Sequence, residues 1–168
     1  MIIESVLGNT AEMSVANLEI DLLPLEWFET TKRIQRKKTA AGREIAIRFL
    51  REGQRLRQGD ILMMDEQHAV VVDIIPSDAI VVTPRNLLEM GSVCYEIGNK
   101  HLPVFIQNDQ VLLPFEEPIF RWLLASGYAT EKQHTRLTNL LNANVQPHSH
   151  GSGGGSSLFS KIMGLTSR

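Results

Sequence analysis

Residues 76–84 read Pro-Ser-Asp-Ala-Ile-Val-Val-Thr-Pro, and they divide the chain into two different patterns. The apolar, β-branched run Ala79–Thr83 predicts a strand. Pro84 favours the first turn of a helix, which the spacing of apolar residues extends from about Arg85 to His101. Before Pro76 the sequence predicts short strands alone, whereas after it strands alternate with helices.

The segment after Pro76 predicts a ferredoxin-like βαββαβ domain over residues 77–143. Pro103 cannot extend the first helix, so we expect a break near Leu102. Residues at three- and four-residue spacing form a stripe on that helix, namely Leu87, Leu88, Gly91, Cys94, Tyr95, Gly98 and His101. The remaining expected elements are strands Val104–Gln107 and Val111–Leu113 around an Asn108-Asp109 turn, a helix Glu116–Ser126 closed by Gly127, and a strand Tyr128–Leu137.

The segment before Pro76 predicts a small barrel or sandwich over residues 1–76. Glu44–Phe49 alternates apolar and polar residues, as a half-buried strand does. Turn signals such as Pro24 and Gly59-Asp60 separate the runs. The other expected strands are Ile2–Leu7, Leu18–Leu23, Ile61–Met64 and Ala69–Ile75. The fold class is therefore α+β, with an all-β part followed by the ferredoxin-like domain.

Residues 144–168 differ in composition from the rest and predict a flexible, histidine-containing tail. Gly151–Ser157 has the composition of a linker, and Leu158–Leu165 is a short amphipathic end. His148 and His150 lie one residue apart in this tail. They fit either a polar tail or a borderline metal site.

Composition excludes several classes of protein. The 168 residues are 43% hydrophobic and 21% charged, with a net charge of −2, so no global field favours nucleic acid or a membrane surface. The single cysteine, Cys94, excludes an intramolecular disulfide and an all-thiolate zinc site. No apolar stretch approaches the roughly 18 residues that span a bilayer. The first residues carry Glu4 and no basic group, so we expect a cytoplasmic protein.

Residues 32–57 form a basic stripe, with ten Lys or Arg against Glu44 and Glu52. Solvated strand faces and loops are the simpler interpretation. The functional alternative is a docking surface for an acidic partner. Nucleic acid is less favoured, because Phe49 is the only aromatic residue of the stripe.

Enzyme signatures are absent: there is no Gly-x-Ser-x-Gly, phosphate-binding loop or His-Glu-x-x-His. Cys94 suits a packing position, and Glu116-Glu117 suits a helix N-terminus, where the dipole favours acids. We expect His68 and His134 to be exposed. His101, at the end of the first helix, fits either a helix cap or a metal ligand.

Gly98-Asn99-Lys100-His101-Leu102-Pro103 resembles the Gly-Asn-x-His-x-Pro signature of the urease accessory nickel chaperones of the UreE type. Arg43–Phe49 and Leu56–Leu62 resemble the β-domain of that family, so the resemblance covers about residues 1–150. It implies a non-enzymatic metallochaperone that delivers Ni(II) for assembly of the urease active site.

The resemblance also implies a homodimer in which His101 of both subunits holds one ion. His148, His150 and water would complete the donor set, and Zn(II) or Cu(II) can bind the same site. The implied partners are the urease accessory GTPase of the UreG type and the apo-urease accessory complex, with no nucleic acid and no membrane. Unlike many members, the chain lacks a polyhistidine tail, and Leu113–Glu117 carries none of the extra histidines seen there in some members.

Two alternatives remain open. One is a protein-interaction or RNA-associated β-module fused to a ferredoxin-like domain without metal chemistry. The other is a metal-dependent enzyme, which is poorly supported because the chain lacks the His, Asp and Glu clustering of an open catalytic metal site.

Overall fold

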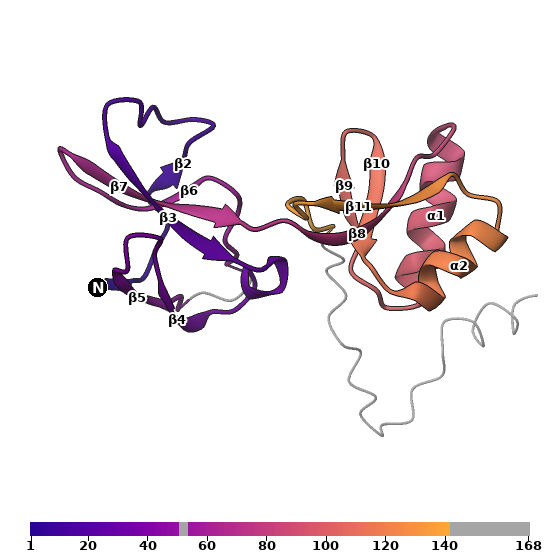
Figure 1. Cartoon of the computed structure of the whole chain (residues 1–168), viewed down its shortest axis with the longest axis horizontal. Helices are drawn as coiled ribbons and strands as arrows, with labels where there is room; N and C mark the ends of the chain where they lie inside the picture. The colour runs from indigo at the N-terminus through magenta and orange to yellow at the C-terminus, as the bar shows by residue number, and fades with distance from the viewer. Residues whose placement is uncertain (51–53, 142–168) are drawn as a thin grey trace, which may run out of the picture.

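The computed structural model describes residues 1–50 and 54–141, which form two lobes side by side (Figure 1). The N-terminal lobe is built from two sheets, of order β1-β5-β4 and β2-β6-β7-β3. A short 3₁₀ helix, η1 (Trp27–Glu29), follows its third strand. The strands are β1 (Ile2–Ile3), β2 (Gly8–Asn9), β3 (Glu19–Leu25), β4 (Ile34–Lys38), β5 (Glu44–Arg48), β6 (Asp60–Met64) and β7 (His68–Ile74).

One apolar core holds the two N-terminal sheets together. The alternation predicted for residues 44–49 is present, since Ile45 and Ile47 are buried while Glu44 and Arg48 are exposed. These side chains share a cluster with Leu23 and Leu25 of β3 and with Val70 and Val72 of β7. The lobe is therefore the small all-β fold that the sequence predicts.

Three details of the N-terminal lobe differ from the sequence expectations. Pro24 lies inside β3 rather than in a turn. In the described sheet β3 is an edge strand next to β7, where a residue without an N–H is tolerated. The sequence does not predict β4, because its composition is basic rather than typical of a strand. It forms by pairing with β5. The expected strand Ile2–Leu7 is shortened to Ile2–Ile3.

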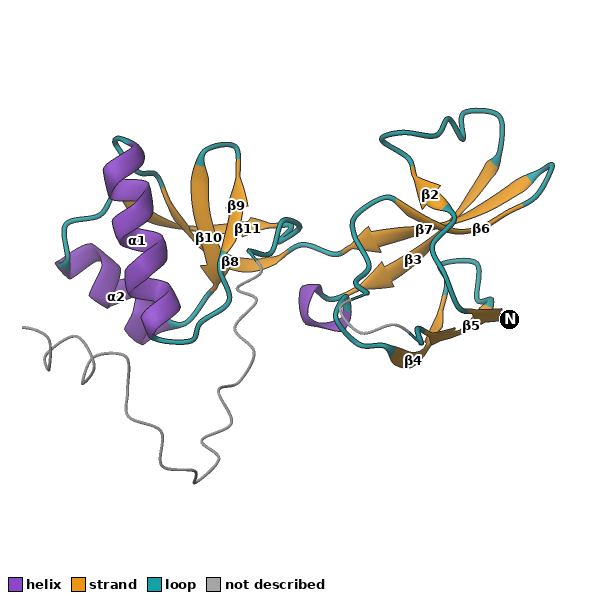
Figure 2. Cartoon of the chain, turned by 180° about the vertical axis from the view of Figure 1, so that it is seen from behind, coloured by secondary structure: helices purple, strands orange, loops and turns teal. Residues whose placement is uncertain are grey.

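The C-terminal lobe has the predicted ferredoxin-like topology. Its antiparallel sheet has the order β11-β8-β10-β9, and both helices cover one face (Figure 2). The elements are β8 (Ser77–Val82), α1 (Leu87–Asn99), β9 (Phe105–Gln107), β10 (Gln110–Pro114), α2 (Glu117–Ala125) and β11 (Thr130–Thr135). No helix in residues 1–50 and 54–141 is both long and apolar enough to cross a membrane.

The central strands of this sheet are buried on both faces. Ile80 and Val82 pack toward the helices, whereas Ala79 and Val81 belong to a second cluster on the opposite face. Trp27 of the N-terminal lobe packs against that second cluster, with its ring edge-to-face to Phe105 at 5.6 Å between centroids. The N-terminal lobe therefore supplies part of the cover that the C-terminal sheet needs.

The Asn108-Asp109 turn of the β9–β10 hairpin allows a first test. Asn108 and Asp109 both lie in the left-handed region, with φ of 49° and 60°, which is the geometry of a type I′ turn. We predict that Asp109→Gly raises the free energy of unfolding by up to about 1 kcal/mol, because glycine adopts this backbone without penalty. The control Asp109→Val lowers it. Urea unfolding followed by circular dichroism measures both, and equal effects would contradict the turn geometry.

Candidate metal centre at the end of helix α1

Helix α1 begins with a well-formed N-cap. The Asn86 side chain accepts a hydrogen bond from the Glu89 backbone N–H at 2.9 Å. The Glu89 carboxylate in turn lies 2.7 Å from the Arg85 guanidinium. The helix therefore begins at Leu87, two residues after the start near Arg85 that the sequence predicts.

The other end of α1 closes with a Schellman motif. The His101 N–H donates to the Gly98 carbonyl at 2.9 Å, and the Leu102 N–H donates to the Ile97 carbonyl at 3.4 Å. His101 occupies the position just after the cap, in the left-handed region with φ of 56°. The Gly98–Pro103 signature therefore contains the residues that form the C-terminal cap of α1.

The residues around His101 are anchored while its ring stays exposed. Ile97 is fully buried, and Leu102 packs against the same core cluster, which is the apolar contact typical of this motif. The Lys100 ammonium lies 4.5 Å from the centre of the Trp122 ring. The chain therefore fixes the backbone of His101 and leaves the imidazole accessible.

Helix α2 ends in the same motif, but with glycine at the equivalent position. Gly127 has φ of 82° and donates to the Leu124 carbonyl at 3.0 Å, and Tyr128 donates to the Leu123 carbonyl at 3.3 Å. Glycine is the usual residue there, because a side chain in this conformation costs roughly 1–2 kcal/mol. The histidine in α1 sits where backbone energetics favour glycine, so this residue is not the most stable choice for the cap.

The stripe of the first helix divides between two faces, and this corrects its interpretation as a single face. Val93 and Ile97 are fully buried, with Met90 and Cys94 packed beside them. Leu87, Leu88 and Tyr95 are 87%, 81% and 71% exposed. The sequence pattern could not separate the two faces, because both carry apolar residues at helical spacing. We call the outward set the exposed α1 face: Leu87, Leu88, Gly91 and Tyr95.

Cys94 and His101 are not brought into one site. Cys94 is half-buried in the core between helices and sheet, and desolvation raises the pKa of its thiol. A protonated thiol is a poor metal ligand, so the expected packing role fits this position. Glu116 and Glu117 stand at the start of α2, as the helix dipole favours.

The other described histidines face carboxylates. His68 Nδ1 lies 3.3 Å from Asp65, whose pKa is lowered by hydrogen bonds from the backbone of Gln67 and of His68. His134 Nδ1 lies 3.0 Å from Asp78, whose pKa is lowered by hydrogen bonds from Lys132 and His134. The first pair closes the turn between β6 and β7, and the second is a cross-strand pair between β11 and β8.

A complete metal site is not formed within the described part of one chain. Residues 1–50 and 54–141 contain no group of three or more His, Cys, Asp or Glu side chains that could hold an ion together. His101 belongs to no such group in these residues, and His148 and His150 lie outside the described residues. Any site at His101 needs donors from the tail or from a second molecule.

Comparison with known proteins gives consistent matches along the chain. Residues 3–74 match the family model of the UreE urease accessory protein, N-terminal domain, and residues 77–156 match that of its C-terminal domain. A urease accessory protein UreE of Flavobacterium johnsoniae is 63% identical over 98% of this chain and 99% of its own length. Those of Actinobacillus pleuropneumoniae and Helicobacter pylori are 43% and 36% identical, over 85% and 89% of this chain and 79% and 90% of their own lengths.

The glycine-like position of His101 predicts an unusual effect on stability. In metal-free protein, His101→Gly should raise the free energy of unfolding by about 1 kcal/mol, because glycine removes the left-handed penalty. The matched control is Gly127→Ala at the equivalent position of α2. It should lower stability by a similar amount, although a Cβ there meets no atom within 4 Å. Thermal and urea unfolding at fixed protein concentration measure both, and a destabilising His101→Gly would show that the imidazole contributes to folding.

Proposed function

The chain belongs to the UreE family of urease accessory proteins, and from this membership we propose that it is a homodimeric metallochaperone that binds Ni(II) and delivers it for assembly of the urease active site. The observation that carries the proposal is the exposed imidazole of His101 at a helix end where glycine is the stable choice. The relatives are named as accessory proteins, which agrees with a role in maturation rather than catalysis.

The exposed α1 face supports a symmetric dimer. Its three large apolar side chains lie on the same helix that ends at His101, and a Cβ built on Gly91 meets nothing within 4 Å, so a second helix can approach closely. In an isologous interface each residue is presented twice. Packing of α1 against α1 of a second subunit thereby allows both His101 rings to meet at the two-fold axis.

The metal is cargo, and the proposed donor set suits transfer. Two imidazoles at the axis would hold one ion, with His148, His150 and water as further donors. Neutral imidazole binds Ni(II), Cu(II) and Zn(II), so Zn(II) or Cu(II) can bind the same site. Because His101 is exposed and the site is divided between molecules, the ion stays accessible to an acceptor. The proposed acceptors are the accessory GTPase of the UreG type and the apo-urease accessory complex.

Nickel titration by calorimetry tests the ligand assignment. The wild type should bind one tight ion per dimer, and His101→Ala should lose this site, with affinity falling by about 100-fold or more because removing one residue deletes two donors. His68→Ala and His134→Ala are the controls and should bind as the wild type does. Deleting the residues after Asn144 should weaken binding if His148 and His150 are donors. Unchanged stoichiometry and affinity in His101→Ala would refute the assignment.

The exposed α1 face predicts how the dimer can be broken. Leu88→Asp places a charge at the centre of the proposed apolar interface, so the protein should become monomeric and lose the shared nickel site. Leu7→Asp, at a residue that is 53% exposed on the N-terminal lobe, is the control and should leave the dimer intact. Light scattering after size-exclusion chromatography gives the mass. A wild type that stays monomeric with and without nickel would be incompatible with the proposal.

A further inference from the structure

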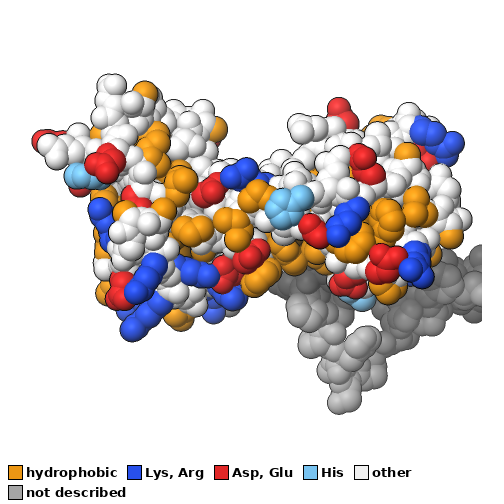
Figure 3. Space-filling view, viewed as in Figure 1, with side chains coloured by type: hydrophobic (Ala, Val, Ile, Leu, Met, Phe, Trp, Pro, Cys, Tyr) orange, Lys and Arg blue, Asp and Glu red, His pale blue; other side chains and the backbone are white. Residues whose placement is uncertain are grey.

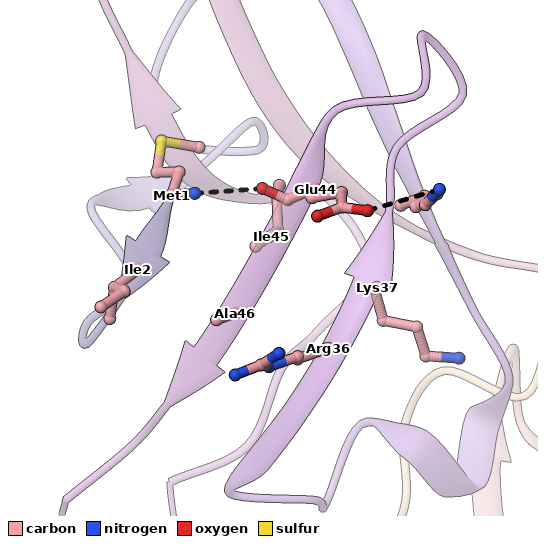
Figure 4. Close-up of a pocket in the computed structure, with 8 residues that line it drawn as sticks. Met1, Ile2, Arg36, Lys37, Glu44, Ile45 and Ala46 are labelled. Carbon is pink, nitrogen blue, oxygen red and sulfur yellow. Dashed lines mark hydrogen bonds and ion pairs between the residues drawn. The ribbon is translucent and has the colours of Figure 1, made fainter.

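A groove crosses the three-stranded sheet β1-β5-β4 of the N-terminal lobe (Figure 4). Helix α1, which precedes His101, lies in the other lobe (Figure 1). Its volume is about 480 Å³. Parallel pairing of β1 with β5 and antiparallel pairing of β4 with β5 bring three distant segments together here. The lining residues are Met1, Ile2, Arg36, Lys37, Lys38, Glu44, Ile45 and Ala46.

The centre of the groove is apolar and open to solvent. Ile2 and Arg36 both stand opposite Ala46 in the strand register, so these side chains lie in one row across the sheet. Ile2 is 65% exposed and Met1 is 47% exposed. One rung further along, Ile34 of β4 is also exposed. Such a cluster of exposed apolar side chains on a soluble lobe suggests a contact surface.

Two arginines lie on the exposed side of this sheet: Arg36 lines the groove at the end of the row, and Arg48 stands outside the lining, opposite Ile34. Arg36 extends from β4 toward Ala46 (Figure 4), whereas the ammonium of Lys37 pairs with Glu29. Within residues 1–50 and 54–141, neither Arg36 nor Arg48 forms an ion pair with a carboxylate. Glu44, the one acidic residue lining the groove, is already paired with Lys38 at 3.4 Å. Lys and Arg side chains gather over β4 and β5 in the space-filling view (Figure 3).

The chemistry of the groove favours protein over RNA. RNA-binding surfaces place exposed aromatic rings where bases can stack. Phe49, the one aromatic residue among residues 32–57, is only 2% exposed and belongs to the core. An aliphatic centre with cationic borders is instead complementary to an apolar side chain flanked by carboxylates.

We propose that this groove binds an extended acidic segment of a partner protein. An apolar residue of that segment packs over Met1, Ile2 and Ala46, while carboxylates on either side pair with Arg36 and Arg48. The inference deepens the proposed function, in which the chain docks onto partners, but it requires no bound metal. Because the groove and His101 lie on different lobes, a partner can be held by one while the ion is exchanged at the other.

The probe for this site is a fluorescent peptide with a central Leu-Val pair and Asp and Glu on both sides. Anisotropy with the full-length, metal-free protein should show binding that weakens as salt is added. Arg36→Glu and Ile2→Asp should each reduce affinity by about tenfold or more, because one reverses a bordering charge and the other charges the apolar row. Arg57→Glu is the matched control, since it makes the same charge change on an exposed residue of the same lobe outside the groove.

Three results would overturn the proposal. Arg57→Glu could weaken binding as much as Arg36→Glu does, which would indicate a general charge effect. A peptide with Lys in place of the acids could bind equally well. A single-stranded oligouridine could bind more tightly than the acidic peptide and compete with it, which would assign the groove to RNA. Circular dichroism confirms folding of each variant. His101→Ala should keep full peptide affinity. Peptide binding therefore tests the groove independently of nickel binding, which tests His101.

Discussion

The hydrogen-bonded cap at the end of α1 is the constraint on which the candidate site depends. Two backbone hydrogen bonds, to the carbonyls of Gly98 and Ile97, reverse the chain and carry it into β9. Burial of Ile97 and Leu102 holds that reversal against the core. His101 is the residue at the turning point, so its backbone is rigid while its ring faces outward. In the metallochaperone proposed above, a donor that both binds and releases an ion would benefit from this combination.

The second organising feature is the shared cover of the C-terminal sheet. Helices α1 and α2 shield one face, and Trp27 of the N-terminal lobe shields part of the other. The Arg136 guanidinium adds a polar contact between the lobes, 3.2 Å from Asp73 of β7. The two lobes therefore stabilise one another, although each has its own core. This arrangement keeps the basic groove on β1, β5 and β4 and the end of α1 on different parts of one molecule. The proposed docking and the proposed metal exchange would therefore use different surfaces.

Apolar residues in α1 serve two purposes that the structure distinguishes. Met90, Val93, Cys94 and Ile97 fill the core, where their removal would leave cavities. Leu87, Leu88 and Tyr95 remain exposed and contribute little to the packing of residues 1–50 and 54–141. Exposed apolar side chains on a helix reduce solubility unless a partner covers them. They lie on the helix whose C-terminal cap carries His101, so the proposed dimer and the proposed metal site depend on the same element.

The sequence by itself determined the fold class, the βαββαβ order and the Asn108-Asp109 hairpin, because turn residues and strand or helix periodicity are local properties. It also singled out His101 as a candidate ligand through the Gly98–Pro103 signature, and that role stays a prediction. It could not determine which of two apolar faces of α1 is buried, since both have helical spacing. Nor could it place Pro24 at a sheet edge, or reveal that β1, β5 and β4 build a groove, because strand pairing joins residues far apart in the chain. Only the tertiary structure decided these points, for burial and exposure depend on what packs against each element.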